Sequence, residues 1–224
     1  MDRNTSDLTP PDESHLGAAP ERQQTAALAQ EHLRASAFVA TQTASESATT
    51  IAEMAEVVIA ALRVGNKVMF CGNGGSAAQS QHLAAELTGR YLRERRPLPA
   101  LALTTDTSAI TAIGNDYRFE EIFRRQLDAL ACSGDVLIAL STSGNSPDVV
   151  LAAQAARLKG VSVLALTGQH GGELTKHSDL ILQVPSVDTP LVQEVHLMVG
   201  HILCDAVERA VIAAPDTFGV GRLV

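Results

Sequence analysis

Short apolar runs alternate with helical stretches over residues 67–213 of this 224-residue chain. The runs that read as strands cover residues 67–71, 100–103, 136–140, 161–166 and 180–184. Short apolar strands interleaved with helices form a parallel sheet that is covered on both faces. The alternation therefore predicts an α/β fold, and sheets of this kind bind ligands at the carboxyl ends of their strands.

The helices between these strands are expected at residues 76–88, 106–114, 119–131 and 147–159, and a long final helix at 191–213. Two amphipathic helices, at 21–43 and 45–63, precede the sheet and must bury their apolar side chains, for which partner subunits are one answer. Apolar side chains on every side of the final helix indicate burial, either in its own core or against another subunit. These side chains are Val195, Leu197, Met198, Ile202, Leu203, Val207 and Val211.

The first twenty residues differ in composition from the rest of the chain. They carry three prolines and many small polar residues, which is typical of a disordered tail. Residues 21–224 have room for a single domain with helical additions, because an apolar share of 46% can bury a sizeable core.

Charge and cysteine content limit the partners and the compartment. A net charge of −8 and 3% aromatic residues disfavour a nucleic-acid-binding protein, which needs clustered Lys and Arg or stacking rings. The one basic cluster, residues 90–96, is interpreted as a solvated loop. Three cysteines without zinc-finger or redox spacing indicate reduced thiols. With neither a signal peptide nor an apolar run of about 18 residues, we expect a soluble cytoplasmic protein with no membrane partner.

A glycine-rich loop, Asn73 to Ser76, joins the first predicted strand to its helix. Its glycines allow backbone N–H groups to approach a ligand closely, and the helix N-terminus adds partial positive charge, so the loop suits a phosphate. The helix then presents His82 and Glu86 on one face, because four residues span about 40° of rotation and about 6 Å of rise. An anion cradle beside two titratable groups predicts a functional site.

A second loop rich in hydroxyl groups follows the predicted strand at 136–140. It contains Ser141, Thr142, Ser143 and Ser146 around one glycine, and it leads into a helix that begins near Pro147. Hydroxyls and backbone amides at a helix N-terminus can bind a phosphate without any Lys or Arg. Turn and capping chemistry accounts for one or two of these residues, and four in six residues favour a binding site.

Five segments of the chain together resemble the sugar isomerase (SIS) family, and within it the isomerases of seven-carbon sugar phosphates. The segments are CGNGGSAAQSQHLAAELTGRY (71–91), AIGNDYRFEEIF (112–123), LSTSGNS (140–146), LTGQHGGEL (166–174) and QEVHLMVGHILC (193–204). The resemblance covers residues 21–213. It implies a flavodoxin-like five-stranded parallel sheet flanked by helices, with N-terminal helices, assembled as a homotetramer whose active sites lie at subunit interfaces.

The resemblance also implies a metal site, at His82, Glu86, Gln193 and His201. Nitrogen and carboxylate ligands suit Zn²⁺, one ion per subunit, and a carboxamide ligand would make the site weak. Eight residues of regular helix separate two side chains by about 12 Å and about 80°. Gln193 and His201 can therefore share an ion only if Gln193 lies at an irregular helix start or if one of the two comes from another subunit.

Substrate contacts follow from the same matching motifs. The hydroxyl loop and Ser76 are expected to hold the phosphate, while the glycine loop faces the sugar. The resemblance assigns substrate contacts to Asn73, Gly74, Gly75, Ser76, His82, Glu86, Arg90, Asn115, Asp116, Ser141, Thr142, Ser143, Ser146 and Gln193.

The implied activity is aldose–ketose isomerisation of D-sedoheptulose 7-phosphate to D-glycero-D-manno-heptose 7-phosphate through an enediol, the first step of ADP- or GDP-heptose synthesis. Glu86 is expected to abstract the proton and His201 to transfer a proton on the opposite side, with the metal polarising the sugar oxygens.

Two other functions remain as alternatives. One is a non-catalytic adaptor for a replication-initiation protein, and the other is an isomerase or sensor of a different sugar phosphate. Retention of all four metal-site residues favours the enzyme. Two departures from the family pattern bear on the second alternative: Gln79 stands where many relatives have Asp, and Leu191 where they have Arg.

Overall fold

The structure of the chain is a computed structural model that describes residues 19–218. Its core is a sheet of five parallel strands in the order β2-β1-β3-β4-β5. The strands are β1 (Val68–Gly72), β2 (Ala100–Ala102), β3 (Val136–Ser141), β4 (Ser162–Gly168) and β5 (Leu180–Val184). This is the predicted flavodoxin-like order. The direction in which successive strands are added to the sheet reverses between β1 and β3, and sheets of this kind open a ligand crevice at that point.

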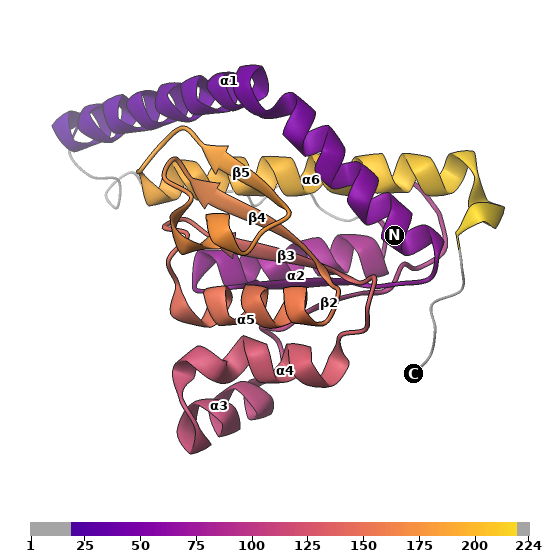
Figure 1. Ribbon diagram of the computed structural model, residues 1–224. Coiled ribbons are helices and arrows are strands. Elements are labelled where there is room, and N and C mark those ends of the chain that lie inside the picture. Colours follow the sequence, from indigo (N-terminus) through magenta and orange to yellow (C-terminus); the bar gives the residue numbers. More distant parts are fainter. Residues whose placement is uncertain (1–18, 219–224) are drawn as a thin grey trace, which may run out of the picture.

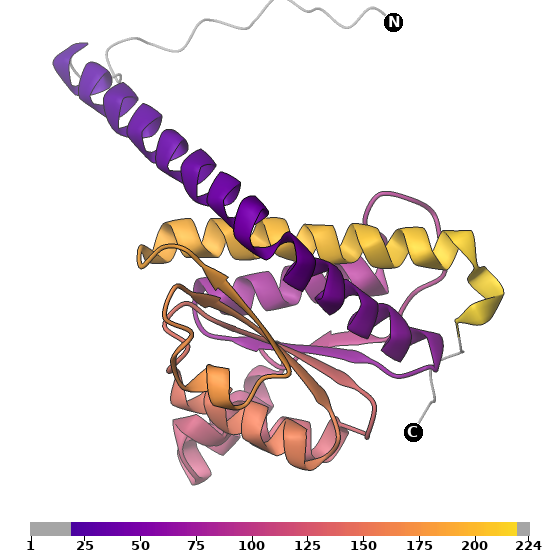
Figure 2. The ribbon, with the colours of Figure 1, turned by 45° about the horizontal axis from the view of Figure 1, so that its top comes forward.

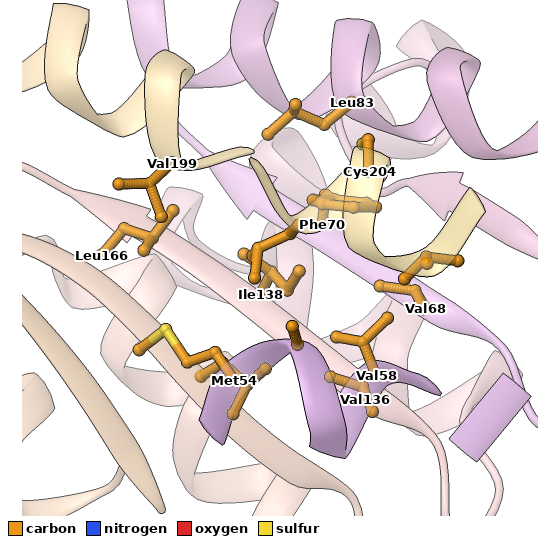
Figure 3. Close-up of a cluster of buried hydrophobic side chains, with 14 of the residues drawn as sticks. Met54, Val58, Val68, Phe70, Leu83, Val136, Ile138, Leu166, Val199 and Cys204 are labelled. Atoms are coloured by element: carbon orange, nitrogen blue, oxygen red, sulfur yellow. The ribbon is translucent and has the colours of Figure 1, made fainter. Parts of the chain in front are cut away.

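Helices cover both faces of the sheet (Figure 1). One face carries α1 (Ala19–Arg63), α2 (Gly75–Thr88) and α6 (Thr189–Ala213), and the other carries α3 (Thr107–Asp116), α4 (Ile122–Leu130) and α5 (Pro147–Leu158). Each face of the sheet has its own hydrophobic core, and successive strand residues point into one core and then the other. Phe70 packs in the core on the α2–α6 side, and Met69 packs in the core on the α4–α5 side. Figure 3 shows the first of these cores, in which Met54 and Val58 of α1 face the sheet.

The two helices predicted before the sheet are one continuous helix of 45 residues. The expected break near residue 44 is wrong, because this stretch contains no glycine or proline and its hydroxyls bond within the helix. Thr41, Thr43 and Ser45 each donate to the carbonyl oxygen four residues earlier, at 2.8, 2.9 and 3.1 Å. The second half of α1 packs on the sheet, whereas the first half projects beyond the body of the molecule (Figure 2).

The remaining boundaries differ from the predicted ones by a few residues. The predicted helix at 119–131 is a 3-10 turn, η2 (Phe119–Glu121), followed by α4, and two further turns are η3 (Gly172–Lys176) and η4 (Pro215–Thr217). Most of the predicted tail, residues 1–18, lies outside the described residues, and its last two residues begin α1. Between residues 19 and 218, no helix has the length and apolar character needed to span a bilayer.

Gly72, at the end of β1, allows the loops after β1 and β3 to lie against each other. A Cβ atom at this position would come within 2.8 Å of both the Leu140 carbonyl oxygen and the Cβ of Ser76. Gly72 also pairs with Leu140 in the sheet register. The glycine loop and the hydroxyl loop therefore leave the sheet side by side.

We expect Gly72→Ala to destabilise the fold by about 1–3 kcal/mol, the usual cost of forcing extra volume into packed backbone. Gly114→Ala in α3 is the matched control, because its Cβ would meet only Ile122 Cγ2, at 3.9 Å. That control should be stabilised by about 0.4–1 kcal/mol. Thermal unfolding at a fixed chain concentration measures both variants, and equal midpoints would contradict the close approach at Gly72.

Candidate active site

The α2 and α6 helices approach each other closely at Gly200. A Cβ atom there would lie 2.5 Å from both methyl carbons of Leu83, so the approach depends on a residue without a side chain. His82 precedes Leu83 and His201 follows Gly200, so this contact brings the two histidines together, with 2.8 Å between their Nε2 atoms. Glu86, one turn further along α2, has its Oε1 3.5 Å from His82 Nε2.

These three side chains form a cluster with metal-binding chemistry. The ligand atoms of His82, Glu86 and His201 all lie within 4.8 Å of one another. Two imidazoles at this distance must either share a proton or direct two lone pairs at one cation. Two imidazole nitrogens and a carboxylate oxygen are a donor set that fits Zn²⁺. The cluster remains accessible to a substrate, because the His82 side chain is 45% exposed.

Gln193, the fourth expected ligand, lies apart from this cluster. It sits inside the regular helix α6, about 12 Å along the axis from His201, so the irregular helix start that would bring the two together is absent there. Its side chain packs on the glycine loop, where a Cβ at Gly75 would come within 2.6 Å of Gln193 Oε1. Gln79, the first departure from the family pattern, donates from Nε2 to the Gln193 carbonyl oxygen at 2.7 Å and so links α2 to α6. Leu191, the second, is buried in the core.

The hydroxyl loop is held in place by the loop after β4. Gly144 has a positive φ of 68° and lies so close to Gly171 that a Cβ would collide with the Gly171 carbonyl oxygen. The Gly144 carbonyl oxygen accepts a hydrogen bond from Leu174 N at 3.0 Å. Ser141 and Ser146 join their hydroxyls at 3.0 Å at the N-terminus of α5. The loop thus gathers hydroxyls at a helix N-terminus, as an anion site requires.

A buried carboxyl group, which the sequence analysis did not single out, connects the two loops. Asn73 Nδ2 donates to Asp148 Oδ1 at 2.9 Å, and Asp148 is only 1% exposed. Burial raises the pKa of the Asp148 carboxyl above its usual range. In the sequence, an acidic residue directly after Pro147 is typical of the first turn of a helix, so nothing in the local pattern indicated that Asp148 belongs to the site.

Three expected substrate contacts lie outside the cluster, two of them on the other face of the sheet. Asn115 and Asp116 end α3 on the opposite face of the sheet, are exposed, and bond to each other at 2.8 Å. Arg90 is exposed beyond the C-terminal end of α2, the end remote from Ser76. Within one chain, the structure therefore assembles only part of the expected substrate site.

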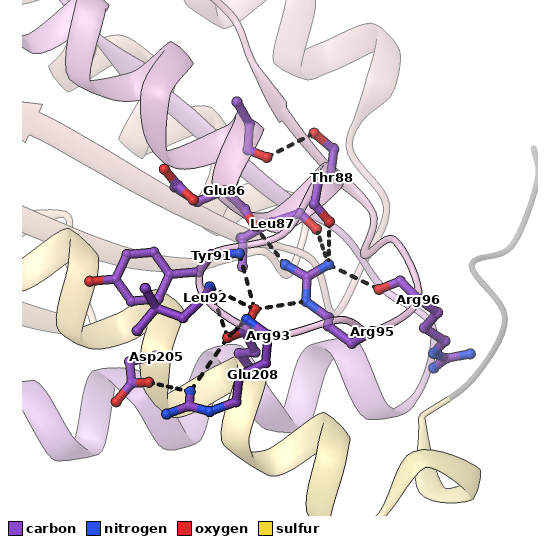
Figure 4. Close-up of polar contacts among 12 residues, drawn as sticks. Glu86, Leu87, Thr88, Tyr91, Leu92, Arg93, Arg95, Arg96, Asp205 and Glu208 are labelled. Atoms are coloured by element: carbon purple, nitrogen blue, oxygen red, sulfur yellow. Dashed lines mark hydrogen bonds and ion pairs between the residues drawn. The ribbon is translucent and has the colours of Figure 1, made fainter.

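The basic stretch 90–96 is not the solvated loop that its charge predicted. The Arg95 side chain is 2% exposed and lies beside the fully buried side chain of Glu208 (Figure 4). Arg93 Nη1 donates to Asp205 Oδ1 at 2.7 Å. The loop places the ring of Tyr91 against that of His201, with 5.4 Å between the ring centroids. Tyr91 and Glu208 are thus further residues at the site that the sequence patterns missed.

Comparison with protein families matches residues 31–168 to the SIS domain. The phosphoheptose isomerase of Rhodospirillum rubrum is 61% identical over 165 residues, which are 74% of this chain and 88% of the relative. That of Nitratidesulfovibrio vulgaris is 54% identical over 164 residues, 73% of this chain and 79% of the relative.

Two solved structures share the fold. The phosphoheptose isomerase GmhA from Neisseria gonorrhoeae is 40% identical with a TM-score of 0.77, covering 84% of this chain and 98% of that one. A phosphoheptose isomerase from Francisella tularensis is 36% identical with a TM-score of 0.80, covering 83% and 98% respectively.

Proposed function

This chain belongs to the SIS-domain family, and we propose how its side chains carry out the isomerisation that its relatives imply. It is a sugar-phosphate aldose–ketose isomerase that converts D-sedoheptulose 7-phosphate into D-glycero-D-manno-heptose 7-phosphate. One observation carries the proposal for its site: His82 and Glu86, on the helix that begins at the glycine loop, meet His201 of α6. A non-catalytic adaptor would have no need of this cluster and is not favoured.

The reaction moves a proton between C1 and C2 of the sugar through an enediol. We assign Glu86 to remove the proton from C1, while His201 donates a proton to the carbonyl oxygen on C2. In the second half of the reaction, His201 takes the proton from the C1 hydroxyl and Glu86 returns its proton to C2. Each residue thus ends in its starting protonation state, and no other reactant is consumed.

The spacing along α2 supports a substrate with its phosphate far from the reacting carbons. Ser76 and His82 are six residues apart, which is about 9 Å of helix rise. This length is comparable with that of an extended seven-carbon sugar phosphate. In our proposal the hydroxyl loop and Ser76 bind the phosphate, and Asn73, Gly74 and Gly75 bind the sugar hydroxyls.

We propose that His82, Glu86 and His201 hold one Zn²⁺ ion in each subunit. Zn²⁺ bound there would act as a Lewis acid towards the sugar oxygens. Gln193 would complete the ligand set only from a second subunit, because it lies too far along α6 from its own His201. Weak binding fits the assignment of Glu86, since a carboxylate held tightly by zinc is a poorer base.

We also propose a homotetramer with active sites at subunit interfaces. Asn115 and Asp116 end α3 on the face of the sheet opposite to the cluster in their own chain, so only a neighbouring chain can bring them to it. Large apolar side chains on α1 and α6 are exposed to solvent in the single chain, and a subunit interface would cover them. Their exposed fractions are 59% for Leu28, 67% for Leu33 and 62% for Phe38 on α1, and 44% for Met198 and 50% for Ile202 on α6.

The rest of the apolar set predicted for the last helix divides between interior and surface. Val195, Leu203, Val207 and Val211 are buried in the core of their own chain. The projecting half of α1 is anchored beside Gln193, because Glu194 accepts hydrogen bonds from His32 and Ser36. This anchoring supports a partner chain packing on α1 close to the glycine loop.

We place the reaction in the cytoplasm on the basis of thiol chemistry. Cys71, Cys132 and Cys204 are all free thiols, and two of them are buried. Burial raises the pKa of the Cys204 thiol to about 12, so it stays protonated and unreactive. Free thiols are typical of proteins that work in a reducing compartment.

Purified protein should convert sedoheptulose 7-phosphate into the aldose, and Glu86→Gln or His201→Ala should lower kcat by at least about a hundredfold, the contribution of a positioned acid or base. Glu53→Gln, at an exposed site on α1, is the control and should keep full activity. Full turnover in both site variants would show that the two residues do not carry the reaction.

Leu33→Asp combined with Phe38→Asp should dissociate the tetramer, because charges would enter the proposed interface. Sedimentation should change from four times the 23.6 kDa chain mass towards a smaller species, with loss of activity. Leu158→Asp is the control, since Leu158 is 90% exposed on α5. A fully active monomer would refute the shared sites.

A further inference from the structure

The loop between α2 and β2 is tied to α6 by a single carboxylate. Glu208 is fully buried, and its two oxygens accept hydrogen bonds from three successive backbone N–H groups (Figure 4). The donors are Tyr91, Leu92 and Arg93, at 3.0, 3.0 and 2.8 Å. Three consecutive amides that converge on one carboxylate fix the backbone of this segment.

Arg95 secures the same loop to the end of α2. Its guanidinium donates to the carbonyl oxygens of Glu86, Leu87 and Gly89, at 2.6, 2.8 and 2.9 Å. These are among the carbonyls that a helix C-terminus leaves without a partner. Arg95 Nε also lies 3.7 Å from Glu208 Oε2, so the two buried charges face each other. Both the helix that carries Glu86 and the loop beyond it are thereby held against α6.

The charge of Glu208 is well compensated in this arrangement. Burial alone would raise the pKa of Glu208, but the backbone N–H groups of Leu92, Arg93 and Tyr91 outweigh it and lower that pKa. Burying a charged group is costly unless hydrogen bonds and an opposite charge satisfy it. Glu208 therefore stays ionised in the interior and keeps all three amides bonded.

The geometry of α6 connects this anchor to the active site. Glu208 and His201 are seven residues apart, which is about two helical turns, so they lie on the same side of α6. The loop that Glu208 binds presents the Tyr91 ring to the His201 ring at 5.4 Å, with 30° between the planes. The His201 ring also meets that of His82 edge-on, with 5.1 Å between the ring centroids. The imidazole of His201 thus contacts two other rings.

We propose that Glu208 is a positioning residue for the isomerase, which acts through Tyr91: by fixing residues 91–93 it holds the Tyr91 ring against His201 and so keeps that imidazole directed at His82 and Glu86. This proposal rests on the role assigned to His201 above. Glu208 itself does not touch the substrate.

A double-mutant cycle in kcat tests this coupling. Glu208→Gln and Tyr91→Ala should each lower kcat by about tenfold or more with KM changed less, because a misplaced catalytic group costs turnover. The double variant should be no slower than the slower single variant, since both changes remove the same contact. Tyr91→Phe keeps the ring and should retain kcat. Asp205→Asn, one turn from Glu208 on α6, breaks only the ion pairs with Arg93 and Arg209 and is the matched control.

Two kinetic results would overturn the proposal. Effects of Glu208→Gln and Tyr91→Ala that multiply would show that the residues act separately. Wild-type kcat in Tyr91→Ala would show that the ring does not position His201. The comparison of kcat between Tyr91→Ala and Tyr91→Phe tests the role of the ring even if Glu208→Gln fails to fold.

Tyrosine fluorescence gives a readout that does not depend on activity. The chain contains no Trp and only two Tyr, so in a Tyr117→Phe background all emission comes from Tyr91. Glu208→Gln should make this emission more accessible to iodide quenching, whereas Asp205→Asn should not. Unchanged quenching in Glu208→Gln would refute the anchor. Because this measurement needs no substrate, it separates failure of the anchor from failure of the assigned catalytic roles.

Discussion

The contact between Gly200 and Leu83 is the constraint on which the site depends. Any side chain at residue 200 would push α6 away from α2, and the two imidazoles on either side of this contact would separate. The strand order places α2 beside the point where the order of strand addition reverses, between β1 and β3, and the same helix begins at the glycine loop. The pair of helices α2 and α6 therefore fixes the cluster of His82, Glu86 and His201 relative to the glycine loop.

The two ends of α2 are fixed by different means. At its start, Gly72 and Gly75 allow backbone and the Gln193 side chain to approach closely, and Asp148 accepts a hydrogen bond from Asn73. At its end, buried charges on Arg95 and Glu208 hold the helix terminus and the following loop. Because packed elements of this kind move little, the fold fixes the distance between the glycine loop and the cluster.

Local sequence patterns predicted most of the fold, but they did not predict contacts between segments that are distant in the sequence. The strands and the fold class followed from short apolar runs, and the pairing of His82 with Glu86 followed from helical spacing. The continuity of α1 did not, because hydroxyls that bond within a helix look in sequence like those that end one. Charge alone likewise misled at Arg95, since its burial depends on a glutamate more than a hundred residues away. The position of His201 required the resemblance, because nothing in its local sequence points to α2.

The most direct test of this account is a crystal structure of the chain with Zn²⁺ and sedoheptulose 7-phosphate, with diffraction recorded at the zinc absorption edge. The account predicts one anomalous peak per chain, about 2.0–2.2 Å from nitrogens of His82 and His201 and an oxygen of Glu86. It also predicts the phosphate against the loop from Ser141 to Ser146. A peak elsewhere, or a sugar bound away from Glu86 and His201, would contradict it.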